Sequence, residues 1–230
     1  MRLFSMEGFA YHACVWVYNL ALTSLLFVVL CLPVVTAPAS AAALFGVSRR
    51  LLRDENPPVF ASFFRMFAEN FWQSMACGWM LAAAGAFLAV DYRIAGIVHT
   101  AANPLVLGAL WLATLVWLFV ALHLFPLMVH MRMTILQLFA SAFKLSLYRG
   151  HLTLANLAVL FVAFELSLRF SLTLFLFFPG AAALVTYWFA DRKFRALQAA
   201  QEARAAAQRA EDGEAPPAAD AAFAGDGRVE

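Results

Sequence analysis

Long apolar segments, separated by short polar clusters, set the pattern of this chain. A helix needs about 20 apolar residues to cross the hydrocarbon core of a bilayer. Segments at about residues 13–35, 71–90 and 104–130 each reach that length. The pattern therefore predicts three transmembrane helices up to residue 130.

A further apolar run, over residues 152–190, is about twice as long as one crossing requires. The polar cluster inside it consists of Glu165, Ser167, Arg169 and Ser171. We expect the chain to turn back at this cluster, which gives a fourth span at about residues 152–168 and a fifth at 171–190. The predicted fold is all-α: a polytopic helical membrane protein whose five transmembrane helices form a single bundle within residues 1–195.

Two connections contain a short amphipathic segment just before the next span, at residues 60–65 and 139–144. Aromatic and basic residues alternate there at helical spacing, which is typical of helices that lie in the membrane interface. We therefore expect two interfacial helices. The two segments resemble each other at an offset of 79 residues. The resemblance reflects either an internal duplication or chance similarity between Phe-rich segments.

Lys and Arg residues gather in alternate connections. Ten of them lie in the first connection, in the third connection and after the last span, against three in the other connections and the N-terminal leader. Because basic connections face the cytoplasm, we predict an external N-terminus, a cytoplasmic C-terminus and cytoplasmic interfacial helices. The residues expected to anchor this topology are Arg49, Arg50, Arg53, Arg65, Lys144, Arg149, Arg192 and Lys193.

The composition changes after the last span. Residues 196–212 are rich in Ala, Arg, Gln and Glu. These residues favour helices, so we expect a cytoplasmic helical extension. Residues 213–230 combine Ala, Pro, Gly and acidic residues, a composition that predicts a disordered tail.

The overall composition excludes a soluble globular protein. Apolar residues make up 64% of the chain and charged residues 13%, with 23 phenylalanines, far from the balance of a soluble domain. The sequence contains no nucleotide-binding loop, metalloprotease motif, nucleophile elbow or pair of carboxylates at catalytic spacing. We therefore predict a protein that is not an enzyme and that needs no cofactor. Its basic clusters follow span ends and do not indicate nucleic acid as a partner.

Glu165 and Arg169 are the first candidates for a functional site, because ionisable residues within a span are costly. Their spacing of four residues puts them on one helix face, where they are able to form an ion pair. Two interpretations follow. The pair either marks the solvated tip of a hairpin between two spans, or belongs to a buried relay or ligand contact.

Asn19, His123 and Asn156 are polar residues within apolar runs. An unpaired polar side chain there costs free energy. A contact with another helix is therefore the first expected role of each residue, and a contact with a ligand is the alternative. His123 and His130 lie near several methionines, yet they supply too few ligands for a closed metal site. The second span also carries a stripe of small residues, for which close helix packing is the expected role. Its members are Gly78, Ala82, Ala83, Ala84 and Gly85.

Several blocks of residues, taken in order, resemble a known family. They are Leu32-Pro33-Val34-Val35-Thr36, Ala41-Ala42-Ala43-Leu44, Arg53-Asp54-Glu55, Phe63-Phe64-Arg65, Asn70-Phe71-Trp72-Gln73-Ser74, Phe125-Pro126-Leu127, and Tyr187 with Arg192. This set is similar to the YesL family of bacterial membrane proteins, also called domain of unknown function 624. The similarity covers about residues 4–197, and the chain departs from it at His123, where an aromatic is more typical, and in its acidic tail.

The resemblance implies a location in the bacterial cytoplasmic membrane and a gene often found beside oligosaccharide uptake transporters. It supplies no catalytic motif. The hypothesis is therefore a non-enzymatic accessory or scaffold subunit that lies in the bilayer and contacts transporter subunits, with carbohydrate as the candidate cargo, or associates with itself. A small channel or transporter acting as an oligomer is the alternative. An intramembrane enzyme is a further one, for which Glu165 and the histidines offer too few groups.

Overall fold

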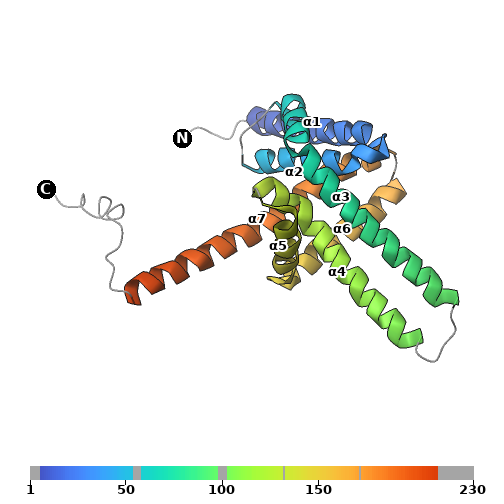
Figure 1. The fold of residues 1–230 in the computed structure, drawn as a ribbon. Coiled ribbons are helices and arrows are strands. Elements are labelled where there is room, and N and C mark those ends of the chain that lie inside the picture. The colour runs from blue at the N-terminus through green and yellow to red at the C-terminus, as the bar shows by residue number, and fades with distance from the viewer. Residues whose placement is uncertain (1–5, 54–57, 98–102, 132, 171, 212–230) are drawn as a thin grey trace. The chain divides into compact units, whose positions relative to one another are not determined.

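The computed structural model describes residues 6–53, 58–97, 103–131, 133–170 and 172–211, and the described part of the chain is helical (Figure 1). The elements are α1 (Met6–Cys31), a short 3-10 helix η1 (Val34–Thr36), α2 (Ala37–Leu52), α3 (Val59–Ile97), α4 (Asn103–His130), α5 (Ile135–Leu147), α6 (Gly150–Phe170) and α7 (Leu172–Glu211). The predicted all-α fold is confirmed. The chain divides into two compact units, Met1–Ala190 and Asp191–Glu230. The boundary falls where the apolar sequence ends.

Four helical segments in the described residues are long and apolar enough to cross a membrane. They are Cys14–Cys31, Val59–Ile97, Pro104–His130 and Gly150–Arg169. Together they make the chain a multi-pass helical membrane protein. The fifth predicted span falls on the first half of α7, where the side chains of residues 171–176 lie outside the described part, so the fifth crossing stays a prediction. The predicted tail at 213–230 also lies outside the described residues.

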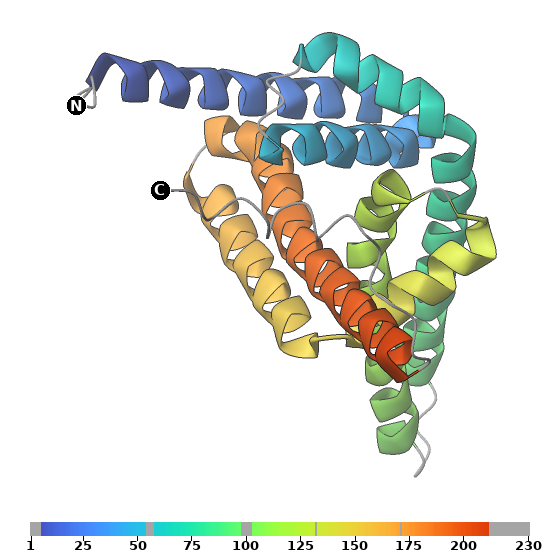
Figure 2. The same ribbon diagram turned by 90° about the vertical axis from the view of Figure 1, so that its left-hand side faces the viewer.

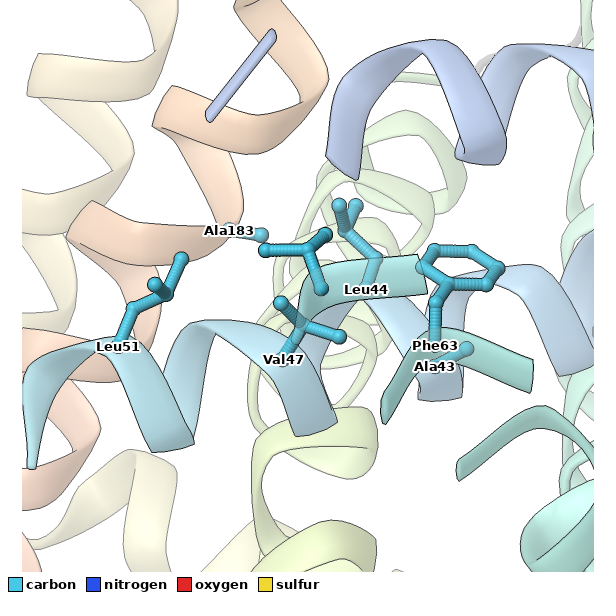
Figure 3. Packing of buried hydrophobic residues seen from close by; sticks show 7 residues of the cluster. Ala43, Leu44, Val47, Leu51, Phe63 and Ala183 are labelled. Atoms are coloured by element: carbon cyan, nitrogen blue, oxygen red, sulfur yellow. The ribbon is translucent and has the colours of Figure 1, made fainter. Parts of the chain in front are cut away.

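α2 is the central helix of the first unit. It contacts α1, α3 and α4, and nine of its 16 residues are buried. Pro38 stands at the start of the helix, where a fixed φ and a missing N–H cost nothing. The alanines that follow let neighbouring helices approach closely. In Figure 3, Ala43, Leu44 and Val47 of α2 lie beside Phe63 of α3 and Ala183 of α7, and these residues belong to one buried cluster.

The structure corrects one prediction about interfacial helices. Residues 60–65 do not form a separate helix but are the first turns of α3, which bends before its long straight part (Figure 2). Val59 and Phe63 are buried in the core cluster there. The separate helix of the first connection is α2, and α2 is buried. The burial of α2 depends on its contacts with α1, α3 and α4, which the local sequence pattern does not show.

The second predicted interfacial segment does lie in a short helix of its own, α5. Thr134 and Gln137 form a capping box at its start, in which the Thr134 backbone N–H donates to Gln137 Oε1 at 3.3 Å. Leu138, Ala142 and Leu145 are buried along one face. The opposite side carries exposed residues such as Lys144, so α5 is amphipathic as predicted.

The long apolar run is divided into two helices at the predicted polar cluster. α6 ends at Phe170 and α7 begins at Leu172, and the chain reverses direction between them (Figure 2). The rings of Phe164 and Phe178 lie 5.7 Å apart and join the two helices.

α7 also packs closely on α1. Pro179 cannot donate a backbone hydrogen bond within the helix, and the next N–H, that of Gly180, donates to Ser24 Oγ at 3.0 Å. A Cβ at position 180 would lie 2.4 Å from that oxygen. Glycine is therefore required for this contact between helices.

Candidate functional site

A hollow lined by three arginines lies at the C-terminal end of α2. Gly46, Arg49, Arg50 and Arg53 of α2 line it together with Met66 of α3 and Val129 of α4. Its volume is about 150 Å³. Since a water molecule takes about 30 Å³ in the liquid, the hollow holds a group larger than a single water. We call it the arginine pocket.

The spacing of the α2 residues produces the pocket. Gly46, Arg49, Arg50 and Arg53 follow the positions i, i+3, i+4 and i+7, which lie on one helix face. The buried residues of the core cluster on α2, such as Leu44 and Val47, lie on a different face. Gly46 lets α2 approach α3 closely beside the pocket, because a Cβ there would lie 2.8 Å from Met66 Cγ. One face of α2 thus holds the bundle together while another presents the guanidinium groups.

Two of the arginines also join helices. Arg49 Nη1 donates to the backbone carbonyl of Val129, in the last turn of α4. Arg50 Nη1 donates to Ser62 Oγ of α3 at 3.3 Å. Both side chains are half-buried, whereas Arg53 is exposed. In the described residues no carboxylate pairs with any of the three; Asp54 and Glu55 lie outside the described part.

The charges around the pocket do not balance within the described residues. α2 and α4 end beside it, and the C-terminal end of a helix carries roughly half a negative charge. Two such ends offset about one of the three positive charges. Among the described residues an excess of about two positive charges remains beside the pocket, and this excess favours an anion.

Two comparisons with known proteins find similar sequences. Residues 20–92 match the family described as "Protein of unknown function, DUF624". The chain is also 29% identical, over 202 residues, to "Uncharacterized protein YesL" of Bacillus subtilis (strain 168), covering 85% of this chain and 94% of that protein. Part of the chain is thus similar to the DUF624 family, and most of it is similar to YesL. No solved structure matches it.

The matched DUF624 segment begins within α1 and ends within α3. It contains α2 and every pocket residue except Val129. The part of the chain that matches the DUF624 family therefore includes the helix that builds the arginine pocket.

The remaining predicted anchors differ in their surroundings. Arg65 is exposed on α3 and lies 3.9 Å from Glu69, one turn further along the helix. Lys144, Arg149 and Arg192 are exposed, and Arg149 adopts a left-handed backbone conformation with φ of 50°. Lys193 is fully buried, and burial lowers the pKa of its ammonium group to about 8. Exposed basic side chains are typical of topology anchors; a buried lysine is not.

The predicted ligand residues are not brought together into one site. Asn19, His123 and Asn156 are buried on α1, α4 and α6, respectively. His123 Nδ1 lies 3.0 Å from the Phe119 carbonyl of its own helix. None of the three lines the arginine pocket. Their burial agrees with contacts inside the bundle, whereas their binding of a ligand stays a prediction.

Glu165 and Arg169, whose spacing allows an ion pair, do not form one in the described structure. Arg169 is exposed in the last turn of α6, and Glu165 is half-buried one turn earlier. The break after Phe170 puts Arg169 next to the turn between α6 and α7. This arrangement fits the hairpin interpretation of the two residues.

Two polar atoms of α6 are buried without a hydrogen-bond partner in the described residues: Asn156 Oδ1 and Ser167 Oγ. The two positions are separated by about three helical turns and share one face of α6. Buried polar atoms normally have a partner, so these two atoms distinguish one face of α6 from the others.

Sequence reasoning missed the arginine pocket and one contact between helices. The distribution of charge predicts only topology anchors at these arginines, although the spacing of Gly46 and the three arginines is a signal for a shared helix face. His130 Nδ1 lies 3.3 Å from Tyr187 Oη and connects α4 to α7. Nothing in the local sequence indicates that contact, because the two residues are far apart in the chain.

Within the described residues, no group of three His, Cys, Asp or Glu gathers to hold a metal.

Proposed function

We propose that this protein is a non-enzymatic accessory subunit of the bacterial cytoplasmic membrane that packs against the helices of a transporter. The observation that carries the proposal is an exposed face of small residues on α3. Ala82, Ala86 and Ala89 lie on this face, and all three are exposed in the first unit. Trp79 and Val90 flank them and are 45% and 52% exposed.

Small residues have a specific role between helices in a bilayer. Lipid tails are as apolar as leucine, so helices associate mainly where small side chains let their backbones approach closely. The glycines of α3 already do this inside the chain. A Cβ at Gly78 would lie 2.3 Å from Pro38, and one at Gly85 would lie 2.9 Å from Trp117. The alanine face repeats this chemistry on a surface that the described residues leave exposed.

A carbohydrate importer is the favoured partner. The support for it is the resemblance to the YesL family, whose genes often lie beside oligosaccharide uptake transporters. The alanine face is suited to a transmembrane helix of such a transporter, because close packing of two helices in lipid needs small side chains on at least one of them.

Site-specific crosslinking in native membranes tests this function. A photoreactive residue at Ala86 is expected to crosslink to a transporter subunit, and the matched probe at Val159, exposed on α6, is not. Copurification in mild detergent should recover the same subunit. Crosslinking of the probe at Ala86 to a second copy of the chain would show self-association instead of a transporter partner. A clean, uncrosslinked monomer in several detergents would refute the proposal.

The proposed topology has the N-terminus outside and the C-terminus in the cytoplasm. Two contacts support a common side for the basic first and third connections. Arg49 donates to Val129 at the end of α4, and Gln73 Nε2 donates to the Met133 carbonyl at 2.7 Å. Since one end of the bundle gathers both connections, the rule that basic connections face the cytoplasm applies to them together.

Cysteine labelling in intact cells tests this topology. After Cys14, Cys31 and Cys77 are replaced by alanine, a membrane-impermeant thiol reagent should label Arg93→Cys from outside and should label Arg149→Cys only after permeabilisation. The opposite pattern would invert the topology. Labelling of both positions from the same side would disprove the predicted arrangement of the spans between them.

A small channel or transporter acting as an oligomer is the second candidate function. The observation that favours it is the pair of buried, unpartnered polar atoms on α6, Asn156 Oδ1 and Ser167 Oγ. A polar pathway would hydrate both atoms. In a channel, Asn156→Cys reacts with a small polar thiol reagent and proteoliposomes conduct solute. An unreactive cysteine together with tight liposomes would eliminate this candidate.

A further inference from the structure

We propose that the arginine pocket binds a phosphate group, carried either by the headgroup of an anionic phospholipid or by a small soluble phosphate ester. This inference does not depend on the transporter partner proposed above. It starts from the three guanidinium groups that line one hollow of about 150 Å³. It also uses the excess of positive charge that the two adjacent helix ends leave there.

The hydrogen-bond donors of the pocket are only partly used by the fold. A guanidinium group has five N–H donors and no acceptor. Arg49 uses Nη1 for the Val129 carbonyl, and Arg50 uses Nη1 for Ser62 Oγ. These contacts hold the two side chains in place at the pocket wall. Their other donors, and those of Arg53, have no partner in the described residues.

The chemistry of the donors suits a phosphate group. The planar fork of arginine matches two oxygens of a phosphate group and binds them with two parallel hydrogen bonds. Three forks around one hollow provide donors for several oxygens of the same group. Side chains that the fold already positions lose less rotamer entropy on binding, so the pocket is pre-organised for such a ligand.

The floor of the pocket strengthens these interactions. Gly46 is buried, Met66 is half-buried, and Val129 is 8% exposed. Apolar groups beside the guanidinium groups lower the local dielectric, and a charge pair is stronger there than in bulk water. A residue that only anchors the topology needs no such floor. Lys144 and Arg149 are examples of such anchors, because both are exposed in the third connection.

The test uses the full chain, purified in a neutral detergent, and two probes. The first probe is inorganic phosphate, titrated by calorimetry. The second is phosphatidylglycerol, supplied in phosphatidylcholine nanodiscs, with native mass spectrometry to count the retained lipids. Arg53→Gln is the main variant, because Arg53 is exposed and holds no other helix in the described structure. Arg65→Gln, on α3 and paired with Glu69, removes the same charge outside the pocket.

We expect Arg53→Gln to weaken binding of one of the probes about tenfold or more, which corresponds to a loss of about 1.4 kcal/mol. Arg65→Gln should stay within about twofold of the wild type, as expected for an exposed charge. Arg53→Lys keeps the charge but lacks the planar fork of donors, so its affinity should lie between those of Arg53→Gln and Arg65→Gln. An unchanged melting temperature shows that each variant is folded.

Each result decides the question. Saturable phosphate binding without selective lipid retention identifies a soluble phosphate ester as the ligand, and selective phosphatidylglycerol retention without phosphate binding identifies a lipid headgroup. Equal losses of affinity in Arg53→Gln and Arg65→Gln would mean that the probes respond to surface charge in general, and this result would overturn the proposal. Absence of binding for both probes would overturn it as well.

Discussion

The first and third connections of this protein are both basic, yet they fold in opposite ways. In the first, α2 is buried among α1, α3 and α4, and Arg49 and Arg50 bond to neighbouring helices. In the third, α5 buries one face, and Lys144 and Arg149 remain exposed. Basic charge alone therefore does not reveal whether a connection lies on the surface of the bundle or forms its centre.

The residues between the charges explain this difference. α2 carries Ala, Ser and Gly on the sides that face other helices, so its backbone approaches them closely. α5 carries exposed large residues such as Leu136 and Phe143 on its outer side. Large apolar residues there favour contact with lipid at the interface. Paired substitutions in the two connections test the comparison.

The largest difference is expected between two leucines. Leu44 of α2 is 4% exposed and Leu136 of α5 is 79% exposed. Leu44→Ala should destabilise the protein by about 2–5 kcal/mol, because it leaves a cavity in the core. Leu136→Ala should change stability by less than about 0.5 kcal/mol. Thermal unfolding in detergent, followed by tryptophan fluorescence, measures both, and similar losses would mean that α2 is no more central than α5.

The next largest difference in stability is expected between substitutions of two basic residues, Arg49 and Lys144. Arg49→Gln removes a charged hydrogen bond to the Val129 carbonyl, and such a bond contributes about 1.5–3 kcal/mol. Lys144→Gln removes an exposed charge and should stay within about 0.5 kcal/mol of the wild type. The same unfolding assay compares them. If Lys144→Gln proved the more damaging, the contrast between the connections would be lost.

Two glycines should change stability in opposite directions. A Cβ at Gly46 would lie 2.8 Å from Met66 Cγ, whereas one at Gly150 would meet nothing within 4 Å. Gly46→Ala should cost about 1–3 kcal/mol through overpacking. Gly150→Ala, in the first turn of α6, should raise stability by about 0.4–1 kcal/mol by restricting the unfolded chain. A stabilising Gly46→Ala would show that α2 and α3 are not in close contact.

The last comparison concerns two basic residues after Ala190, Arg192 and Lys193. Burial lowers the pKa of Lys193 from 10.5 to about 8. Between these values the unfolded chain binds the proton more tightly than the folded chain, so stability should rise with pH and the penalty is complete below pH 8. Lys193→Met should abolish this rise, and Arg192→Met, at an exposed position, should keep it. A melting temperature independent of pH in all three proteins would contradict the prediction.

The sequence by itself determined the class of the protein. Apolar segments of membrane-crossing length predicted a multi-pass helical fold, and ordered motifs around Arg53 and Trp72 predicted the DUF624 family. The turn between α6 and α7 was predictable for the same reason: the largely apolar run of 39 residues at 152–190 exceeds one crossing, and one polar cluster interrupts it. These inferences depend on hydrophobicity and length, which are properties of a segment alone.

Only the tertiary structure decided which side of each helix is covered. Arg49 and Lys144 are both basic residues in predicted cytoplasmic connections, but one bonds to α4 and the other is exposed. The contact of His130 with Tyr187 and the hollow beside Gly46 likewise depend on how distant segments pack. In a bilayer, apolar residues are favourable against lipid and against protein alike. Hydrophobicity therefore predicts which segments enter the membrane, whereas packing of small residues and hydrogen bonds between helices determines their partners.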